Sequence, residues 1–467
     1  MSAPPDDRPA ATRLRPDPRV LLTLTALALL SRLVWNLWIH PPGEYVFSDM
    51  GQYVLRAKNL AEAGFVWGQR TLAWQSFGTH YLLAAVFKVF GVEPPHTAGA
   101  VVFALLGAGS VPLTYLVACQ VMKRAWMATT AGVLALLWYP NVATTGYFLS
   151  ETPFLFFQLL ANFWMLRTFQ EGKRAVAAGI AAGICFMLRP QSAVFFVLVF
   201  VTWLVNVRRL PAVRARQVIG FAAPLLLAFL FSLTRFYLHT GYWGGVAESA
   251  NMNMTAGRCH NIVTQAFPSQ RALERSVETG NTRDGRRVSV PGLRALAGLP
   301  NYHPLALRPA LGGETIRFVG YIGDPFIHRD LQRRCVRRTG LVGQLRYALG
   351  NLSLQWFFAK QWPDQEPKAR KYFMPIAEAY RYLFAAVFLA PSLLGVGLAL
   401  RRLRAEPAMA LLAWQIVGSM VIAAIFFGDV RLRTPYDPYA LILAIYAAAQ
   451  VIEAGRWLRE RYRNRVS

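Results

Sequence analysis

Residues 20–53 read VLLTLTALALLSRLVWNLWIHPPGEYVFSDMGQY, a long apolar run followed by a short polar loop. The run at 20–39 is long enough to cross a bilayer as a helix, which takes about 20 residues. The loop then presents Asp49 a few residues past the end of that helix. A carboxylate at this boundary still reaches water, so it could act as a general base or bind a metal or a hydroxyl. Ser48 or Asp49 could instead cap a helix that begins near residue 50.

The composition excludes an ordinary soluble enzyme. Of the 467 residues, 55% are hydrophobic and only 16% are charged, which is typical of a polytopic membrane protein. The net charge of +26 could suggest a nucleic-acid partner. However, the Arg residues cluster at the ends of apolar runs, as expected for cytoplasmic loops, so we expect no nucleic acid. Residues 1–19, rich in Pro, Arg and Asp, predict a disordered cytoplasmic tail.

We predict an all-α polytopic membrane protein with about ten transmembrane helices. The apolar runs that predict them lie at 20–39, 97–121, 125–140, 152–169, 174–189, 191–207, 217–238, 378–400, 407–428 and 435–454. The positive-inside rule places the Lys and Arg clusters on the cytoplasmic side, which requires an even number of membrane crossings between any two clusters. This gives an N-terminal transmembrane catalytic module at 20–238, and C-terminal transmembrane helices with a basic cytoplasmic tail at 378–467.

The first external loop spans residues 40–96. It is expected to carry two juxtamembrane helices, at about 51–63 and 79–90. The second is apolar but too short to cross the hydrocarbon core, and counting it as a crossing would move Lys123 and Arg124 to the outside. We therefore expect it to lie in or on the outer leaflet.

A large mixed segment at 239–377 is also expected outside the membrane. It is polar and rich in Arg, Gly and Pro. Its later part, 329–361, has helix-like leucine spacing and is expected to rest on the membrane surface. Two of the four cysteines, Cys259 and Cys335, fall in this segment, and we expect a disulfide between them because oxidation is possible outside the cell.

On this topology, the ionisable residues that interrupt apolar sequence gather on the external side. Glu151 begins a span, where its carboxylate could cap a helix. With Asp49 it could instead form a pair from two external loops, suited to a cation or to a sugar hydroxyl and its base.

Three arginines, Arg189, Arg431 and Arg433, lie on the side that the positive-inside rule disfavours. One reason for an external Arg is an anionic ligand, because guanidinium binds phosphate oxygens in bidentate fashion. The alternatives are structural pairs with Asp429 or Asp437, or contact with lipid headgroups. His80 could point at the same site, or it could be a packing residue.

These motifs resemble those of the GT-C superfamily of integral-membrane glycosyltransferases, especially the branch of protein O-mannosyltransferases and aminoarabinose-lipid A transferases. The matching pieces cover residues within 20–240 and 378–454. They are Ser48-Asp49-Met50 with Tyr53, Gly78-Thr79-His80-Tyr81-Leu82-Leu83-Ala84 to Phe90-Gly91, Ser150-Glu151-Thr152-Pro153, Leu188-Arg189-Pro190, and Arg431-Leu432-Arg433-Thr434-Pro435.

The resemblance implies transfer of a sugar from a polyprenyl-phosphate carrier to an external glycan, lipid or protein, usually with inversion. It implies an inner-membrane protein with its active site on the external, periplasmic face. Asp49 would then be the base and Glu151 its partner. The resemblance also implies that the carrier phosphate is bound by Arg189, Arg431 and Arg433. It implies contacts to the donor or acceptor from Tyr53, His80 and Tyr81. Segment 239–377 has no counterpart in the resemblance and is expected to recognise the acceptor.

A divalent metal stays open, because Met50 stands where many relatives of this kind have a second acidic residue beside Asp49; Asp49 and Glu151 would be its ligands. Two other functions also stay open. One is an O-antigen-ligase-like or oligosaccharide transferase with a diphosphate-linked donor. The other is a lipid or solute transporter or flippase, which would be expected to place ionisable groups near the membrane midplane and often to show repeated halves. Neither feature is visible in the sequence.

Overall fold

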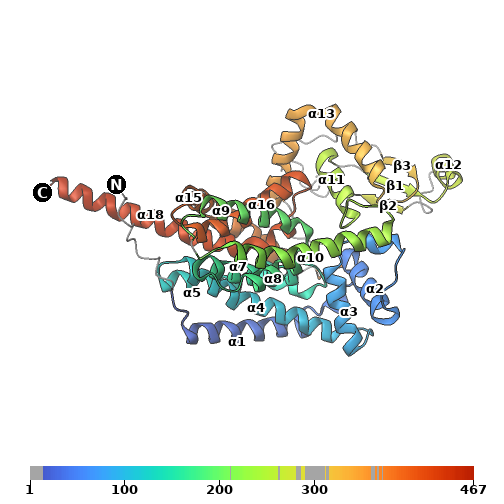
Figure 1. Ribbon diagram of the computed structural model, residues 1–467. Coiled ribbons are helices and arrows are strands. Elements are labelled where there is room, and N and C mark those ends of the chain that lie inside the picture. Colours follow the sequence, from blue (N-terminus) through green and yellow to red (C-terminus); the bar gives the residue numbers. More distant parts are fainter. Residues whose placement is uncertain are drawn as a thin grey trace.

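Long helices lie side by side in one bundle, and the middle of the chain projects from one end and one side of it (Figure 1). The structure is a computed structural model that describes residues 14–210, 212–260, 263–279, 286–289, 311, 315–358, 363–364, 368–370 and 372–466. The C-terminal helix α18 (Asp437–Val466) extends past the bundle at the opposite end (Figure 1). The expected tail at 1–19 lies mostly outside the described residues.

Among the described residues, six helical stretches are long and apolar enough to cross a membrane. They are Pro18–Ile39 (α1, Pro18–Val34, and a π-turn), Thr97–Val121 (α4), Ala215–Thr240 (α10), Phe373–Arg401 (α14, Phe373–Leu383, to α15, Leu389–Arg401), Pro407–Ile425 (α16) and Val430–Asn464 (α17, Val430–Arg433, to α18). The mostly helical membrane architecture is therefore confirmed, whereas the count of ten spans is not.

The four other predicted spans are helices that fall short of this criterion. Three of them, α5 (Ala125–Leu137), α8 (Ala175–Leu188) and α9 (Ala193–Val205), have 13 or 14 residues. At 1.5 Å per residue they cover about 20 Å, against about 30 Å of hydrocarbon. The fourth, α7 (Glu151–Glu171), is long enough but carries charges at both ends.

These short helices end where the chain offers other partners to the backbone. The guanidinium of Arg32 in α1 is buried and donates to the carbonyl oxygens of Ala135 and Leu136, the last turn of α5. Cations stabilise helix C-termini, so this bond favours an end at that point. Pro190 separates α8 from α9, because proline disfavours helical geometry in the residue before it.

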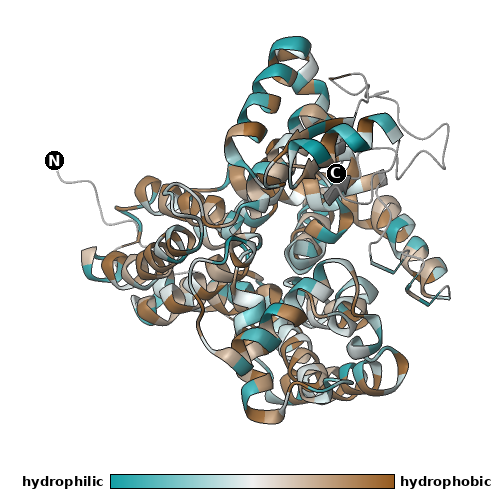
Figure 2. Ribbon diagram, turned by 90° about the vertical axis from the view of Figure 1, so that its right-hand side faces the viewer, coloured by the Kyte–Doolittle hydropathy of each residue, from teal (hydrophilic) through white to brown (hydrophobic). Residues whose placement is uncertain are grey.

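The bundle packs around α4, which lies against α1, α5 and α7. Polar side chains join three of its helices: Gln158 of α7 donates to Gln415 of α16 at 2.6 Å, and Asn162 of α7 donates to the hydroxyl of Tyr439 of α18 at 2.9 Å. In an apolar environment such bonds fix which helices are neighbours. Figure 2 looks from the end of the bundle and shows hydrophobic residues over most of its helices.

Residues 40–96, the loop predicted to be external, fold into two helices, α2 (Ser48–Ala63) and α3 (Gly78–Phe90), with short turns at Pro42–Tyr45 and Arg70–Ala73. The helices pack on each other through a core that includes Tyr53, Leu83 and Phe87. At Gly78 the backbone comes so close to α8 that a Cβ atom would lie 2.7 Å from the backbone nitrogen of Leu188. This contact fixes the start of α3 beside the end of α8.

Short helical turns carry the chain across the end of the bundle where α2 and α3 lie. They are α6 (Tyr139–Ala143), Thr144–Gly146, Pro190–Ser192, α17 and Thr434–Tyr436. All of them except α17 contain a Pro or Gly, which favours turns over continued helix.

The projecting segment contains α11 (Ser249–Cys259), α12 (Gln270–Thr279) and α13 (Pro325–Ser353), followed by a π-turn at Leu354–Phe358. It also has a three-stranded sheet in the order β2 (Arg286–Ser289), β1 (Val263–Phe267), β3 (Thr315–Val319). β1 is antiparallel to β2, with Val263 opposite Ser289, and parallel to β3, with Val263 opposite Thr315. Cys259 of α11 and Cys335 of α13 form a disulfide.

Candidate active site

Four ionisable residues meet at the end of the bundle where α2 and α3 lie. Arg431 donates through Nη1 to Asp49 Oδ2 at 2.9 Å and through Nε to Glu151 Oε1. Arg189 donates through Nη2 to the same Glu151 oxygen at 2.5 Å and through Nε to Ser150 Oγ at 3.0 Å. We call Asp49, Glu151, Arg189 and Arg431 the carboxylate–arginine cluster. Four residues of the sequence-based hypothesis therefore lie together.

Each member of the cluster comes from a different part of the chain. Asp49 is in the first turn of α2, Glu151 in the first turn of α7, Arg189 between α8 and the next turn, and Arg431 in α17. Asp429 begins α17 by accepting a bond from the backbone N–H of Arg431 at 2.7 Å, which fixes the start of that helix.

Neither carboxylate belongs to the N-cap residue of its helix. The N-cap positions are Phe47 for α2 and Ser150 for α7, and neither makes a side-chain cap bond. Asp49 and Glu151 instead direct their oxygens to arginine side chains of other segments. The cap expected at Ser48 or Asp49 is therefore wrong, whereas the Glu151 carboxylate meets its own backbone N–H in the first turn of α7 as well as the two arginines.

The side chains of the cluster differ in their exposure to solvent. The side chain of Glu151 is 1% exposed, that of Arg431 15% and that of Asp49 40%. Burial opposes ionisation of Glu151, but Arg189 and Arg431 outweigh it and lower its pKa. Glu151 is therefore a buried anion that binds two arginines, whereas Asp49 is the member of the cluster most exposed to solvent.

Tyr53 lies one helical turn after Asp49, and its side chain is buried. Burial, together with the nearby charge of Asp49, raises its pKa to about 12. The phenol is therefore neutral at physiological pH and can donate a hydrogen bond.

Arg433 does not join the cluster. Its guanidinium is 1% exposed and donates to Asp437 Oδ1 at 2.8 Å and to the carbonyl oxygen of Trp356 at 3.3 Å. Its Cζ atom also lies 3.7 Å from the ring centroid of Phe384. This is the structural pair with Asp437 that the sequence left open.

His80 and Tyr81 line a separate cavity of about 200 Å³ between α2, α3 and the end of α10. Its other polar or charged lining residues are Arg56, Asn59, Glu62, Gln69, Arg235 and His239. We call it the α2–α10 cavity. Four of these residues are buried: Arg56, His80, Arg235 and His239.

Arg235 is the most unusual residue of the α2–α10 cavity. It is 1% exposed, and its Nη2 donates to the carbonyl oxygen of Leu72 at 2.5 Å. Within the part of the chain that the structure describes, its Nε and Nη1 atoms have no hydrogen-bond partner and no carboxylate pairs with it. The Arg235 Cζ atom also lies 4.9 Å from the ring centroid of Phe77 and 5.8 Å from that of Tyr81. Burying a guanidinium without a full set of hydrogen-bond partners is costly, and an anion could supply the missing ones.

His80 contributes a neutral donor or acceptor to the same cavity. It is 2% exposed, and its Nδ1 has no hydrogen-bond partner among the described residues. Burial first, and then the charges of Arg235 and Arg56, hold its pKa well below the usual value. The imidazole is therefore uncharged unless an anion enters.

A series of side-chain hydrogen bonds connects the α2–α10 cavity to the carboxylate–arginine cluster. Arg56 donates to Gln75 Oε1 at 2.7 Å, and Gln75 Nε2 donates to Asp49 Oδ1 at 3.3 Å. The α2–α10 cavity and the accessible carboxylate therefore share one polar network. Sequence reasoning missed Arg56, Gln75 and Arg235, although Arg235 interrupts the apolar run 217–238 and such residues are functional candidates.

A divalent metal between Asp49 and Glu151 does not fit this arrangement. The guanidinium of Arg431 already binds both carboxylates and supplies the positive charge that a metal would bring. Within the described ranges, no group of three or more His, Cys, Asp or Glu side chains is placed to hold a metal ion.

No protein-family model matches the sequence, and no curated protein matches it significantly. Among solved structures, the chain is similar to the oligosaccharyltransferase of Archaeoglobus fulgidus tethered with an acceptor peptide, with a TM-score of 0.46 and 13% identity. The match covers 94% of this chain and 50% of that one, so the chain spans about half the length of that enzyme.

The chain is also similar to ArnT from Cupriavidus metallidurans bound to undecaprenyl phosphate, with a TM-score of 0.37 and 14% identity over 92% of this chain and 77% of that one. Both TM-scores are below 0.5, so residue roles must rest on the contacts of this chain. Both solved structures are membrane glycosyltransferases of the GT-C superfamily, the superfamily that the sequence motifs resemble.

Proposed function

We propose that the protein is a GT-C-like membrane glycosyltransferase that moves a sugar from a polyprenyl-phosphate carrier to an acceptor hydroxyl on the external face. One observation carries the proposal. The accessible carboxylate of Asp49 is hydrogen-bonded through Gln75 and Arg56 to a cavity whose buried Arg235 lacks an anionic partner among the described residues. A base and a phosphate site connected in this way suit attack by a hydroxyl on a phosphate-linked sugar.

The cluster holds Asp49 ready as the base. Arg431 binds one carboxylate oxygen of Asp49 and is itself fixed by Glu151. In the transfer step, the acceptor O–H gives its proton to Asp49, and the acceptor oxygen forms a bond to the anomeric carbon. The bond from that carbon to the phosphate oxygen breaks, and the carrier leaves as polyprenyl phosphate. Attack from the face opposite the phosphate inverts the anomeric centre.

The carrier phosphate fits the α2–α10 cavity better than the carboxylate–arginine cluster. The charges of Arg189 and Arg431 are met by Glu151 and Asp49, and that of Arg433 by Asp437. Arg235 has no such partner among the described residues, and His80 and Tyr81 line the same cavity. We therefore propose that Arg235 and His80 bind the departing phosphate, whose charge increases as the bond breaks.

The test is sugar transfer by the purified full chain in liposomes. Labelled polyprenyl monophosphate and diphosphate sugars are supplied with a membrane-glycan extract, with and without a chelator. Asp49→Asn should lower transfer about 10²-fold or more, as expected for loss of a general base. The matched control is Glu93→Gln, an exposed carboxylate of the same loop that lies outside the cluster.

Transfer from monophosphate donors that requires Asp49 would support the proposal, and transfer only from diphosphate donors would favour the oligosaccharide-transferring alternative. If the sugar stays on the carrier with every donor tested, and Asp49→Asn instead changes the movement of lipid or solute across the membrane, the protein is a transporter rather than an enzyme. Loss of transfer with chelator would contradict the role given to Arg431 as the cation between the carboxylates.

A further inference from the structure

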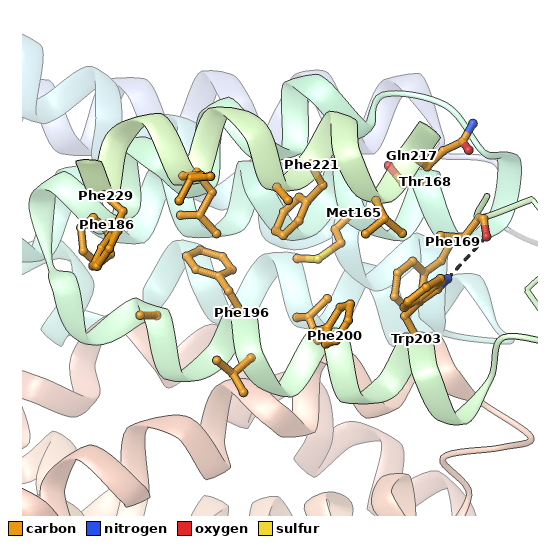
Figure 3. Close-up of a pocket in the computed structure, with 18 residues that line it drawn as sticks. Met165, Thr168, Phe169, Phe186, Phe196, Phe200, Trp203, Gln217, Phe221 and Phe229 are labelled. Carbon is orange, nitrogen blue, oxygen red and sulfur yellow. Dashed lines mark hydrogen bonds between the residues drawn. The ribbon is translucent and has the colours of Figure 1, made fainter. Parts of the chain in front are cut away.

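A long apolar groove lies between α9 and α10, with α7 and α8 as its floor (Figure 3). Its volume is about 430 Å³, more than twice that of the α2–α10 cavity. The lining includes Met165 of α7, Phe186 of α8, Phe196 of α9 and Phe221 of α10. We call it the α9–α10 groove.

The polar groups of the groove lining are satisfied by the protein itself. Gln217 Nε2 donates to the carbonyl oxygen of Gly172 at 3.0 Å, Thr168 Oγ1 to that of Lys173 at 2.9 Å, and Trp203 Nε1 to that of Val213 at 3.4 Å. The groove therefore presents an apolar surface to an occupant. A polar or charged ligand would find no partner for its own groups there.

The groove has the length of one membrane leaflet. Along α10 it runs from Gln217 to Phe229, twelve residues, or about 18 Å at 1.5 Å per residue. Half of a hydrocarbon core of about 30 Å is about 15 Å. Phe186 and Phe229 meet edge to face at one end, with ring centroids 5.6 Å apart, and Trp203 and Gln217 lie at the other (Figure 3).

The end marked by Gln217 is basic. Arg174, Arg214 and Arg216 are exposed around it, with Glu171 as the nearest acidic neighbour in sequence. These residues belong to the Lys and Arg clusters that the positive-inside rule assigns to the cytoplasm. Anionic lipids are concentrated in the cytoplasmic leaflet and are attracted by basic residues near the surface, by about 1 kcal/mol for each.

We propose that the α9–α10 groove binds one acyl chain of an anionic phospholipid from the cytoplasmic leaflet, with its phosphate at Arg174, Arg214 and Arg216. The acyl chain fills the space between α9 and α10. The groove is open on one side, where Val197, Phe200 and Leu226 are exposed at its rim. Close van der Waals packing, rather than escape from water, favours such binding within a bilayer. The site does not depend on the proposed sugar transfer.

The experiment uses the full chain in nanodiscs of equal phosphatidylglycerol and phosphatidylcholine, followed by gentle release and native mass spectrometry. Ala222→Trp places an indole in the groove, because Ala222 lines it. Ala223→Trp is the matched control, since Ala223 is equally exposed on the same helix but does not line the groove. We expect wild type and Ala223→Trp to retain one phosphatidylglycerol and Ala222→Trp to lose it at least tenfold, with equal melting temperatures for the two variants.

A second measurement tests the headgroup. Replacing Arg214 and Arg216 by Gln should leave a bound lipid but reduce the preference for phosphatidylglycerol over phosphatidylcholine several-fold. Equal retention by the two Trp variants would overturn the groove assignment, and an unchanged preference in the Gln variant would overturn the headgroup assignment. Displacement of phosphatidylglycerol by added polyprenyl phosphate would assign the groove to the carrier tail and also overturn the proposal. These measurements do not depend on sugar transfer, so their outcome is independent of the proposed activity.

Discussion

The hydroxyl of Tyr147 donates a hydrogen bond to Asp364 Oδ1 at 2.8 Å, in the interior of the protein. Tyr139 donates to the other oxygen of the same carboxylate at 2.9 Å. Tyr147 lies four residues before Glu151, so the two bonds tie the segment that follows α13 to the loop that presents Glu151. Nearby, Arg370 donates to Glu44 at 2.9 Å and so ties this segment also to the loop that leads to Asp49.

Replacing Asp364 by Asn should loosen this connection. The amide group of Asn can accept from only one of the two tyrosine hydroxyls, so the other loses its partner in a buried place. The expected loss of stability is about 1–3 kcal/mol, with a drop in transfer rate because both carboxylate loops become less well positioned. Thermal unfolding and transfer are measured together. Asp330→Asn, at an exposed i,i+4 pair, is the control and should change neither.

Asp364 also predicts a pH dependence of stability. Burial raises the pKa of its carboxyl from 3.8 to about 6, although the two tyrosine hydroxyls lower it. The folded chain therefore holds this proton more tightly than the unfolded chain. The contribution of Asp364 to the free energy of unfolding should fall as pH rises from about 4 to about 6, by about 3 kcal/mol, and stay constant above. Asp364→Asn should remove this slope, and an equal slope in the variant would assign it to other groups.

The sequence predicts the helices of this protein better than their relation to the membrane. Every predicted span is helical, and the helices expected at 51–63 and 79–90 are α2 and α3. Apolar periodicity carries that much information. It does not show that the last turn of α5 is bonded by Arg32, a residue more than a hundred positions away.

Removing the charge of Glu151 should destabilise the protein more than removing that of Asp49. Glu151→Gln leaves two arginines without their shared buried carboxylate, which costs about 3–5 kcal/mol for a broken buried pair. Asp49→Asn breaks only the more exposed contact with Arg431 and should cost less than about 1 kcal/mol. Thermal unfolding of the two variants in detergent measures the difference. Equal destabilisation would mean that Asp49 is as much a structural partner as Glu151.

Arg433 and Arg431 should respond differently to substitution, although they are two residues apart. Arg433→Gln breaks a fully buried pair with Asp437, so it should lower the melting temperature and, in the protein that remains folded, leave the KM for the donor unchanged. Arg431→Gln should instead lower kcat, because Asp49 loses the group that orients it. Kinetics on the folded fraction of each variant, isolated by size-exclusion chromatography, make the comparison. A higher donor KM in Arg433→Gln would restore the phosphate role that the sequence suggested.

The site residues were predicted in part because their chemistry is unusual for their position. An external Arg is rare enough to be noticed, so the sequence pointed to Arg189, Arg431 and Arg433 alike. It could not separate them, because the partner of each is chosen by packing: Glu151 for the first two and Asp437 for the third. Arg56 escaped notice because a charged residue in the middle of an amphipathic helix normally faces water, whereas here it is buried beside Gln75.

Arg235 gives the sharpest test of the phosphate site. Arg235→Gln keeps a polar amide at this position but is shorter, has fewer N–H donors and removes the charge in the α2–α10 cavity. If the carrier phosphate binds there, the KM for polyprenyl-phosphate sugar should rise about tenfold or more, since a charge-assisted bond contributes about 1.5–3 kcal/mol. The KM for the acceptor should not change. Stability should hold or increase, because the variant no longer buries a guanidinium that lacks an anion.

The control for Arg235→Gln is Arg329→Gln, an exposed arginine of the projecting helix α13. It removes the same charge from the protein and so corrects for any general effect on attraction of an anionic donor. A structural role for Arg235 predicts the opposite pattern: Arg235→Gln would lower the melting temperature and kcat while donor KM stayed constant. Because a phosphate ligand stabilises the state that binds it, added polyprenyl phosphate should raise the melting temperature of wild type and Arg329→Gln but not of Arg235→Gln.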